Sequence, residues 1–150
     1  MLLWFYSIRV KILLIPTDFS AASQQALNYG LSYLQERRAE GKILLLNTYL
    51  LPSASPNQLV AIHDELRNKS IQRLQDQISL QVSPIKNIRS SKVTFETLSR
   101  MGTLENVIVH IAQEEQVDSV ILGIEGTLKE KERVTKLLNH IHCPLVIVSS

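Results

Sequence analysis

The sequence has 150 residues, of which 45% are hydrophobic and 20% are charged, and this composition suits one soluble domain with a buried core. The formal net charge is only +2, and the basic residues are scattered without interleaved aromatic side chains, which excludes the clustered positive surface that nucleic-acid binding needs. The single cysteine, Cys143, cannot form an internal disulfide, so we expect a reducing, cytoplasmic location.

The first eight residues, MLLWFYSI, are dense in apolar and aromatic side chains. They lack the basic start and cleavage site of a secretory signal, and a membrane span needs roughly 20 apolar residues. We therefore expect no membrane partner, and we assign residues 1–9 to an N-terminal extension of a domain that covers residues 10–150. The extension either packs on the domain or docks on a partner as an apolar arm, and a mis-assigned start codon would also explain it.

Short apolar runs alternate with amphipathic helical patterns from Val10 to the end of the chain. The runs predict strands at residues 10–15, 43–46, 93–98, 119–122 and 145–148. Helical spacing of apolar residues predicts helices that begin near Ser20, near Asn57, after Thr103 and before Val134. In the second helix, over about residues 57–80, the side chains expected to face the core are Leu59, Ile62, Leu66, Leu74 and Ile78.

This alternation predicts an α/β fold with a doubly wound, five-stranded parallel sheet and helices on both faces. The expected strand at residues 43–46 is apolar on both faces, which is typical of an interior strand. Residues 93–98 alternate between apolar and polar side chains, which is typical of an edge strand. Ligands of such sheets bind at the carboxyl ends of the strands.

Polar and glycine residues gather at those carboxyl ends. Thr17 and Asp18 follow the first strand, Asn47 ends the second, and Gly123 and Gly126 follow the fourth. Asp18 stands just before a helix, where it either caps the first turn or contacts a ligand, and Thr17 has the same two roles open to it.

Four stretches resemble the universal stress protein family in their order and spacing. They are KILLIPTDFSAASQQAL, the turn at Gly102, VDSVILGIEG and the closing HCPLVIV, and together they extend over nearly the whole chain from Val10. The resemblance implies an adenine nucleotide alpha hydrolase-like, Rossmann-like fold with the strand order 3-2-1-4-5.

ATP-binding members of that family carry two glycines after the fourth strand and, nine residues later, a third glycine followed by serine or threonine. Glycine lets the backbone approach phosphates, to which N–H groups and the hydroxyl then donate. Gly123 and Gly126 match the first pair, but Lys136 and Leu137 stand at the second, so this member lacks the full ATP-binding motif. Asp18 matches the family position that contacts the nucleoside.

The resemblance therefore implies a set of candidate nucleotide-site positions, in which Lys136 would substitute as a point-charge contact to a phosphate. The set is Thr17, Asp18, Asn47, Gly123, Gly126 and Lys136. We expect no cofactor, with ATP as the alternative.

Catalytic and metal chemistry lack the residues that they need. No histidine is expected near Asp18 and Ser20, and no P-loop follows the first strand, so we expect no catalytic residues and no enzyme. His140, His142 and Cys143 supply too few ligands in usable geometry, so we expect no metal.

The last strand combines an apolar sequence with an edge position, since the implied strand order places it at an open edge of the sheet. The resemblance then implies a homodimer through the C-terminal strand Leu145, Val146, Ile147 and Val148. We expect a homodimeric binding or regulatory module of the stress response that does not depend on ATP and has an unknown protein partner. The alternatives are an ATP-binding member with weak hydrolysis and an interaction subunit that uses the N-terminal arm.

Overall fold

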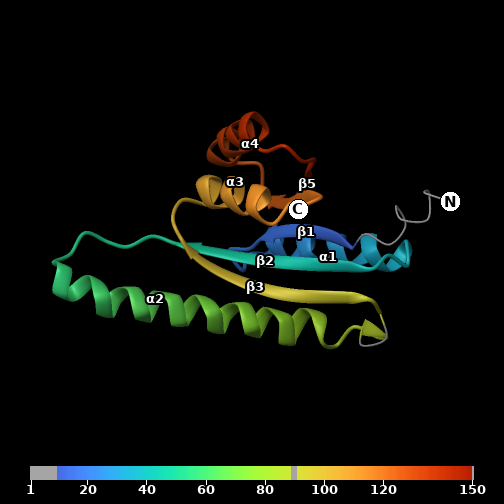
Figure 1. Ribbon diagram of the computed structural model, residues 1–150, viewed down its shortest axis with the longest axis horizontal. Coiled ribbons are helices and arrows are strands. Elements are labelled where there is room, and N and C mark those ends of the chain that lie inside the picture. Colours follow the sequence, from blue (N-terminus) through green and yellow to red (C-terminus); the bar gives the residue numbers. More distant parts are fainter. Residues whose placement is uncertain (1–9, 89–90, 150) are drawn as a thin grey trace.

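A computed structural model describes residues 10–88 and 91–149, so the expected N-terminal extension lies outside the described residues. Five parallel strands form one sheet in the order β3-β2-β1-β4-β5. Helices cover both faces (Figure 1), which confirms the predicted fold class. The elements are β1 Lys11–Pro16, α1 Ala21–Glu36, β2 Gly41–Tyr49, α2 Pro56–Gln77, the π-helical turn η2 Ile78–Val82, β3 Val93–Met101, α3 Leu104–Glu114, β4 Ser119–Ile124, α4 Leu128–His140 and β5 Leu145–Ser149.

Alternate residues of the strands feed two separate cores, because successive strand side chains point to opposite faces. Leu13 and Ile15 of β1 pack with α1 and with the inner part of α2. Leu14 of β1 packs on the other face with α3 and with Leu137 of α4. The central strand is therefore buried on both sides, as its continuous apolar sequence predicts.

The strands take the positions in the sheet that were expected for them. β2 lies inside the sheet, and β3 and β5 lie at its two edges, as predicted. β2 and β3 continue past their expected ends, because Asn47, Thr48 and Tyr49 pair in register with Ser99, Arg100 and Met101. Asn47 therefore lies within β2 rather than at its end.

The outer half of α2 departs from the prediction. Leu59, Ile62 and Leu66 are only half-buried, and neither hydrophobic core includes them. The helix begins beyond the end of β2 and its first turns extend past the sheet (Figure 1), so there is little strand surface for them to cover. Full burial starts at Ser70. Leu74 is the first α2 side chain in the core on the α1 face of the sheet, which we call the α1-side core.

None of the helices within residues 10–88 and 91–149 is long and apolar enough to cross a membrane.

We predict unequal effects of truncating two leucines of α2. Leu74→Ala should lower the free energy of unfolding by about 3 kcal/mol, because Leu74 is fully buried and its loss leaves a cavity. Leu59→Ala should lower it by less than about 1 kcal/mol, because that side chain remains partly in water. Urea denaturation of both variants measures the difference, and equal losses would show that the outer half of α2 is packed as tightly as the inner half.

Candidate functional site

Thr17 follows the carboxyl end of β1 and lies beside Asn47 of β2. The backbone N–H of Thr17 donates to Leu46 O at 2.7 Å, and Asn47 Nδ2 donates to Thr17 O at 2.8 Å. The first residue after β1 is thus held against β2 through both its backbone N–H and its backbone carbonyl. We call this end of the sheet the mouth; it comprises Thr17, Asp18, Asn47, Gly123 and Gly126.

The polar atoms of Thr17 and Asn47 are already used within the protein. The Thr17 hydroxyl is buried and lies 2.8 Å from Gln77 Oε1, to which it donates. Asn47 Oδ1 accepts from the Ser70 hydroxyl at 2.7 Å, and Ser99 in turn donates to Ser70 at 2.7 Å. The described residues contain no buried side-chain nitrogen or oxygen without a partner, so this network needs no ligand to complete it.

Asp18 organises the turn before α1 while staying exposed. Its carboxylate accepts from the backbone N–H of Ser20 at 3.0 Å and from the Ser23 hydroxyl at 3.1 Å. Burial raises the pKa of the Asp18 carboxyl, but these hydrogen bonds outweigh it and hold the pKa below its ordinary value. The N-cap of α1 is Ser20, whose hydroxyl accepts from Ser23 N, so Asp18 positions the cap instead of serving as it.

The two glycines of the mouth are required for different physical reasons. A Cβ at Gly123 would collide with the backbone carbonyl of Ala22 and lie 3.0 Å from Ser23 N, so β4 ends directly against the first turn of α1. Gly126 has a φ of +92°, which disfavours other residues, although nothing lies within 4 Å of where its Cβ would be. Gly123 thus serves packing, and Gly126 serves the turn into α4.

The carboxylate of Glu130 occupies the loop between β4 and α4. Its Oε2 accepts from Glu125 N at 3.0 Å, and its Oε1 accepts from Thr127 N at 2.9 Å and from Thr127 Oγ1 at 2.8 Å. The backbone N–H groups of Thr127 and Glu125 hold the pKa of the Glu130 carboxyl below its ordinary value. An anion-binding arrangement of N–H groups therefore exists here, and it already holds an internal anion.

The capping role of Glu130 was not predicted from the sequence, although a signal for it is present. Thr127 and Glu130 form a capping box, in which the Thr127 hydroxyl accepts from Glu130 N at 3.2 Å. The spacing of threonine followed three residues later by glutamate is the recognised signature of this motif.

Lys136 and Leu137 lie in α4, away from the residues that gather at the mouth. Leu137 is fully buried in the core beneath α3 and α4. Lys136 is exposed and lines a hollow between α3 and α4 together with Glu105 and His140. Both residues are in the interior of a helix, where backbone N–H groups donate to the preceding turn and are not free for a phosphate.

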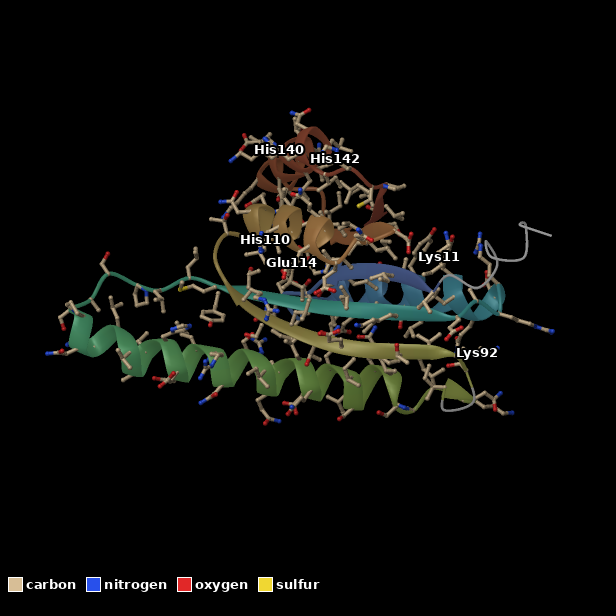
Figure 2. All side chains as sticks on the ribbon, in the orientation of Figure 1. Lys11, Lys92, His110, Glu114, His140 and His142 are labelled. Atoms are coloured by element: carbon tan, nitrogen blue, oxygen red, sulfur yellow. The ribbon has the colours of Figure 1, made fainter. Side chains whose placement is uncertain are left out.

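The histidines and the cysteine on the α3–α4 side of the described structure are not arranged as metal ligands. Figure 2 shows His110 and Glu114 on α3 and His140 and His142 around the end of α4. His110 Nε2 lies 2.8 Å from Glu114 Oε2, and His140 Nδ1 lies 2.8 Å from Lys136 O. Burial raises the pKa of the Cys143 thiol, and the negative charge of Asp118 raises it further, so the thiol stays protonated. In the part of the chain that the structure describes, no three His, Cys, Asp or Glu side chains are grouped as metal ligands would be.

Comparison with known proteins gives one family and a consistent fold. A sequence model of the universal stress protein family matches residues 9–149. The universal stress protein UspA from Lactobacillus plantarum is 18% identical, with a TM-score of 0.70 over 93% of this chain and 98% of that chain.

Two further solved structures carry ligands in their descriptions. A universal stress protein family protein from Arabidopsis thaliana, described with AMP bound, is 17% identical with a TM-score of 0.65, over 93% of this chain and 91% of that chain. A universal stress protein described in complex with cAMP is 14% identical with a TM-score of 0.57, over 93% of this chain and 97% of that chain. At these identities the likeness shows the fold. No curated protein matches the sequence.

We predict that the two glycines of the mouth respond differently to an added methyl group. Gly123→Ala should destabilise the protein by about 3 kcal/mol, because α1 must move away from β4 to admit the Cβ. Gly126→Ala should cost about 1–2 kcal/mol, because only its backbone conformation is unfavourable. Thermal or urea unfolding compares the two, and a smaller loss for Gly123→Ala than for Gly126→Ala would contradict the close packing of α1 on β4.

Proposed function

The chain belongs to the universal stress protein family, and we propose that it acts as a homodimeric binding or regulatory module that does not depend on ATP and catalyses no reaction. The observation that carries ATP independence is the Glu130 carboxylate, which occupies the backbone N–H groups of the loop after β4. A phosphate entering this loop would have to displace a bound carboxylate or lie beside its negative charge. Either route removes the advantage that such a loop gives to an anion.

The residues at the second half of the family's ATP-binding motif are also unsuited to binding a phosphate. A glycine and a hydroxyl residue would offer open backbone and a donor, whereas Lys136 and Leu137 lie within α4. Leu137 is buried in the core, so its position cannot turn toward a ligand without unpacking α4. These features support a member of the family that does not depend on ATP.

The homodimer is proposed from the open edge at β5. β5 pairs with β4 on one side only, and its other side is an edge of the sheet. Val146 and Val148 pack toward α1 and Leu145 packs toward α3 and α4, whereas Ile147 remains 38% exposed. An apolar edge strand of this kind offers unpaired backbone groups and an uncovered side chain to a second copy.

A second candidate function is adenine nucleotide binding, and two observations favour it. Structural relatives are described with AMP bound and in complex with cAMP. In this chain the exposed Asp18 carboxylate and Gly123 lie at the same end of the sheet, where a nucleoside would find a polar contact. Under this candidate weak ATP hydrolysis would follow, but Lys136, the phosphate contact expected from the sequence, lies in α4 away from the mouth.

The setting of this module follows from the sequence. A stress-response role comes with the family, and one cysteine suits a cytoplasmic protein. A protein partner would suit a module without chemistry of its own. Docking on a partner is one of the alternatives for residues 1–9, which lie outside the described residues.

We predict that ATP with magnesium leaves the thermal unfolding of the native protein unchanged up to millimolar concentrations. A ligand at 100 times its Kd would stabilise the fold by about 2.7 kcal/mol, which is easily visible. Glu130→Ala should gain a weak, saturable shift, because it frees the N–H groups of the loop, whereas the neighbouring Glu132→Ala should not.

The native protein and Glu130→Ala answer different questions in that titration. A saturable shift in the native protein would refute ATP independence and make Lys136 the next residue to change. A flat response in Glu130→Ala would leave ATP independence standing and remove Glu130 as its cause.

We predict that Ile147→Lys converts the dimer to a monomer without unfolding it, because the charge would be buried between two edge strands. Sedimentation or light scattering measures the mass. Val60→Lys is the matched control, since Val60 is 67% exposed on α2, which packs against β2 and β3 at the far side of the sheet. A monomeric native protein, or a dimer that survives Ile147→Lys, would contradict the proposed interface.

A further inference from the structure

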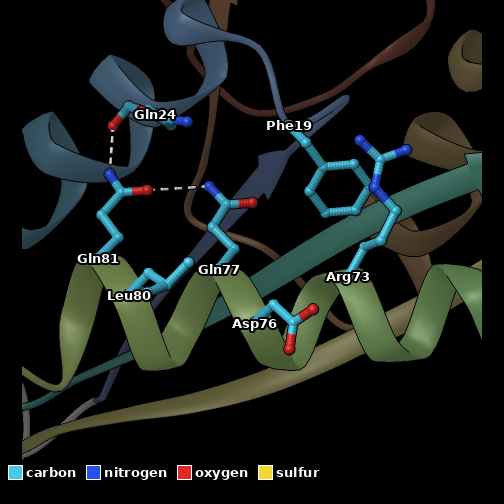
Figure 3. Close-up of a pocket in the computed structure, with 7 residues that line it drawn as sticks. All are labelled: Phe19, Gln24, Arg73, Asp76, Gln77, Leu80 and Gln81. Atoms are coloured by element: carbon cyan, nitrogen blue, oxygen red, sulfur yellow. Dashed lines mark hydrogen bonds between the residues drawn. The ribbon is translucent and has the colours of Figure 1, made fainter.

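A hollow of about 340 Å³ lies between the start of α1 and the inner half of α2, on the face of the sheet opposite α3 and α4. Its volume falls within the roughly 300–1,000 Å³ that is usual for small-molecule sites. Figure 3 shows Phe19 entering from the turn before α1, facing side chains that α2 and η2 present at helical spacing. The α2 and η2 lining residues are Arg73, Asp76, Gln77, Leu80 and Gln81.

Two backbone irregularities shape this hollow. Phe19 has a φ of +67°, a left-handed conformation that a bulky aromatic residue rarely adopts. Leu80 and Gln81 belong to η2, a π-helical turn, and such turns occur often at functional sites. Strained backbone persists only where its surroundings enforce it, and here both irregularities place side chains in one hollow.

The walls are apolar where a ring could lie. The Phe19 ring is half-buried against the α1-side core and presents its remaining surface to the hollow. Leu80 is 80% exposed at the rim, so the fold itself does not use its side chain. An aromatic ligand would find here the contact surface that Leu80 now presents to water.

Arg73 supplies the charge. Its guanidinium stacks on the Phe19 ring, with Cζ 4.2 Å from the ring centroid (Figure 3). Within residues 10–88 and 91–149 it forms no ion pair and no hydrogen bond, so its planar N–H donors are held in place and unused. A guanidinium in this state matches a carboxylate, which it binds with two parallel hydrogen bonds.

The other polar groups narrow the choice of ligand. Gln77 Nε2 donates to Gln81 Oε1 at 3.0 Å, and Gln81 Nε2 donates to Gln24 O, so the amides are already paired (Figure 3). Asp76, whose carboxylate accepts from Gln72 Nε2 at 2.9 Å, adds one negative charge to the lining. Because the Asp76 carboxylate offsets the charge of Arg73, the lining disfavours a nucleotide or another polyphosphate more strongly than a ligand with a single negative charge.

From these contacts we infer that the hollow binds a small aromatic carboxylate, with its ring beside Phe19 and Leu80 and its carboxylate on Arg73. Gln77 also accepts from the Thr17 hydroxyl, so the floor of this site connects directly to the mouth. This site lies outside the Gly123–Gly126 loop and does not depend on how that loop treats ATP.

The test compares a charged probe with a neutral one of the same shape. Protein-observed NMR titration with 2-naphthoate should give saturable shifts at Phe19 and Leu80, and 2-naphthamide should bind the same residues more weakly. Arg73→Gln should weaken naphthoate about tenfold and leave naphthamide within about twofold, because only the charge-assisted contact is lost. Arg67→Gln on the same helix, where Arg67 pairs with Asp64 at 3.4 Å, is the matched control and should change neither.

Leu80→Asp gives a second, independent variant, and its exposed position leaves the fold intact. It should weaken both probes, because it removes apolar wall and adds negative charge. The inference is overturned if naphthoate produces no saturable shifts at Phe19 and Leu80. It is also overturned if Arg73→Gln and Arg67→Gln weaken naphthoate equally, or if neither weakens it.

Discussion

One buried hydroxyl residue at the end of the central strand ties the polar parts of this protein together. Thr17 fixes β1 to β2 through its backbone, and its hydroxyl reaches Gln77 on α2. Phe19 N donates back to the same hydroxyl at 3.0 Å, which helps to hold the Phe19 backbone in its unusual conformation. The mouth and the hollow are therefore built around one residue, and a shift of Thr17 would disturb both.

The loop after β4 gives its converging backbone N–H groups a partner within the same chain. Gly126 still makes the turn and the N–H groups still converge, but their partner is Glu130 of the same chain. A carboxylate tethered three residues from the N-cap has an effective concentration that a free phosphate must overcome. The same contacts cap α4, so the loop also stabilises the start of that helix.

Much of the sheet could be predicted from the sequence, because burial leaves a pattern in some of the strands. The apolar run at residues 43–46 indicates an interior position and the alternation at residues 93–98 indicates an edge, and the resemblance to the universal stress protein family supplied the strand order. The prediction that the outer half of α2 faces the core was wrong. The spacing of Leu59 and Ile62 indicates that they share a helix face, but it does not indicate whether a sheet lies beneath that face. The hollow beside Phe19 could not be predicted from the sequence, because Phe19 and Arg73 are far apart in the sequence and come together only in the folded protein.

α2 is continuous in shape but divided in stability. Its inner half is anchored by Leu74 in the core and by Gln77 at Thr17, so we expect its amide protons to exchange more slowly than those of the outer half. Its outer half rests on half-buried side chains and on the 2.8 Å hydrogen bond between Tyr49 and His63. The outer turns can therefore unwind and rewind as a separate cooperative unit, while the inner turns keep the mouth and the hollow assembled.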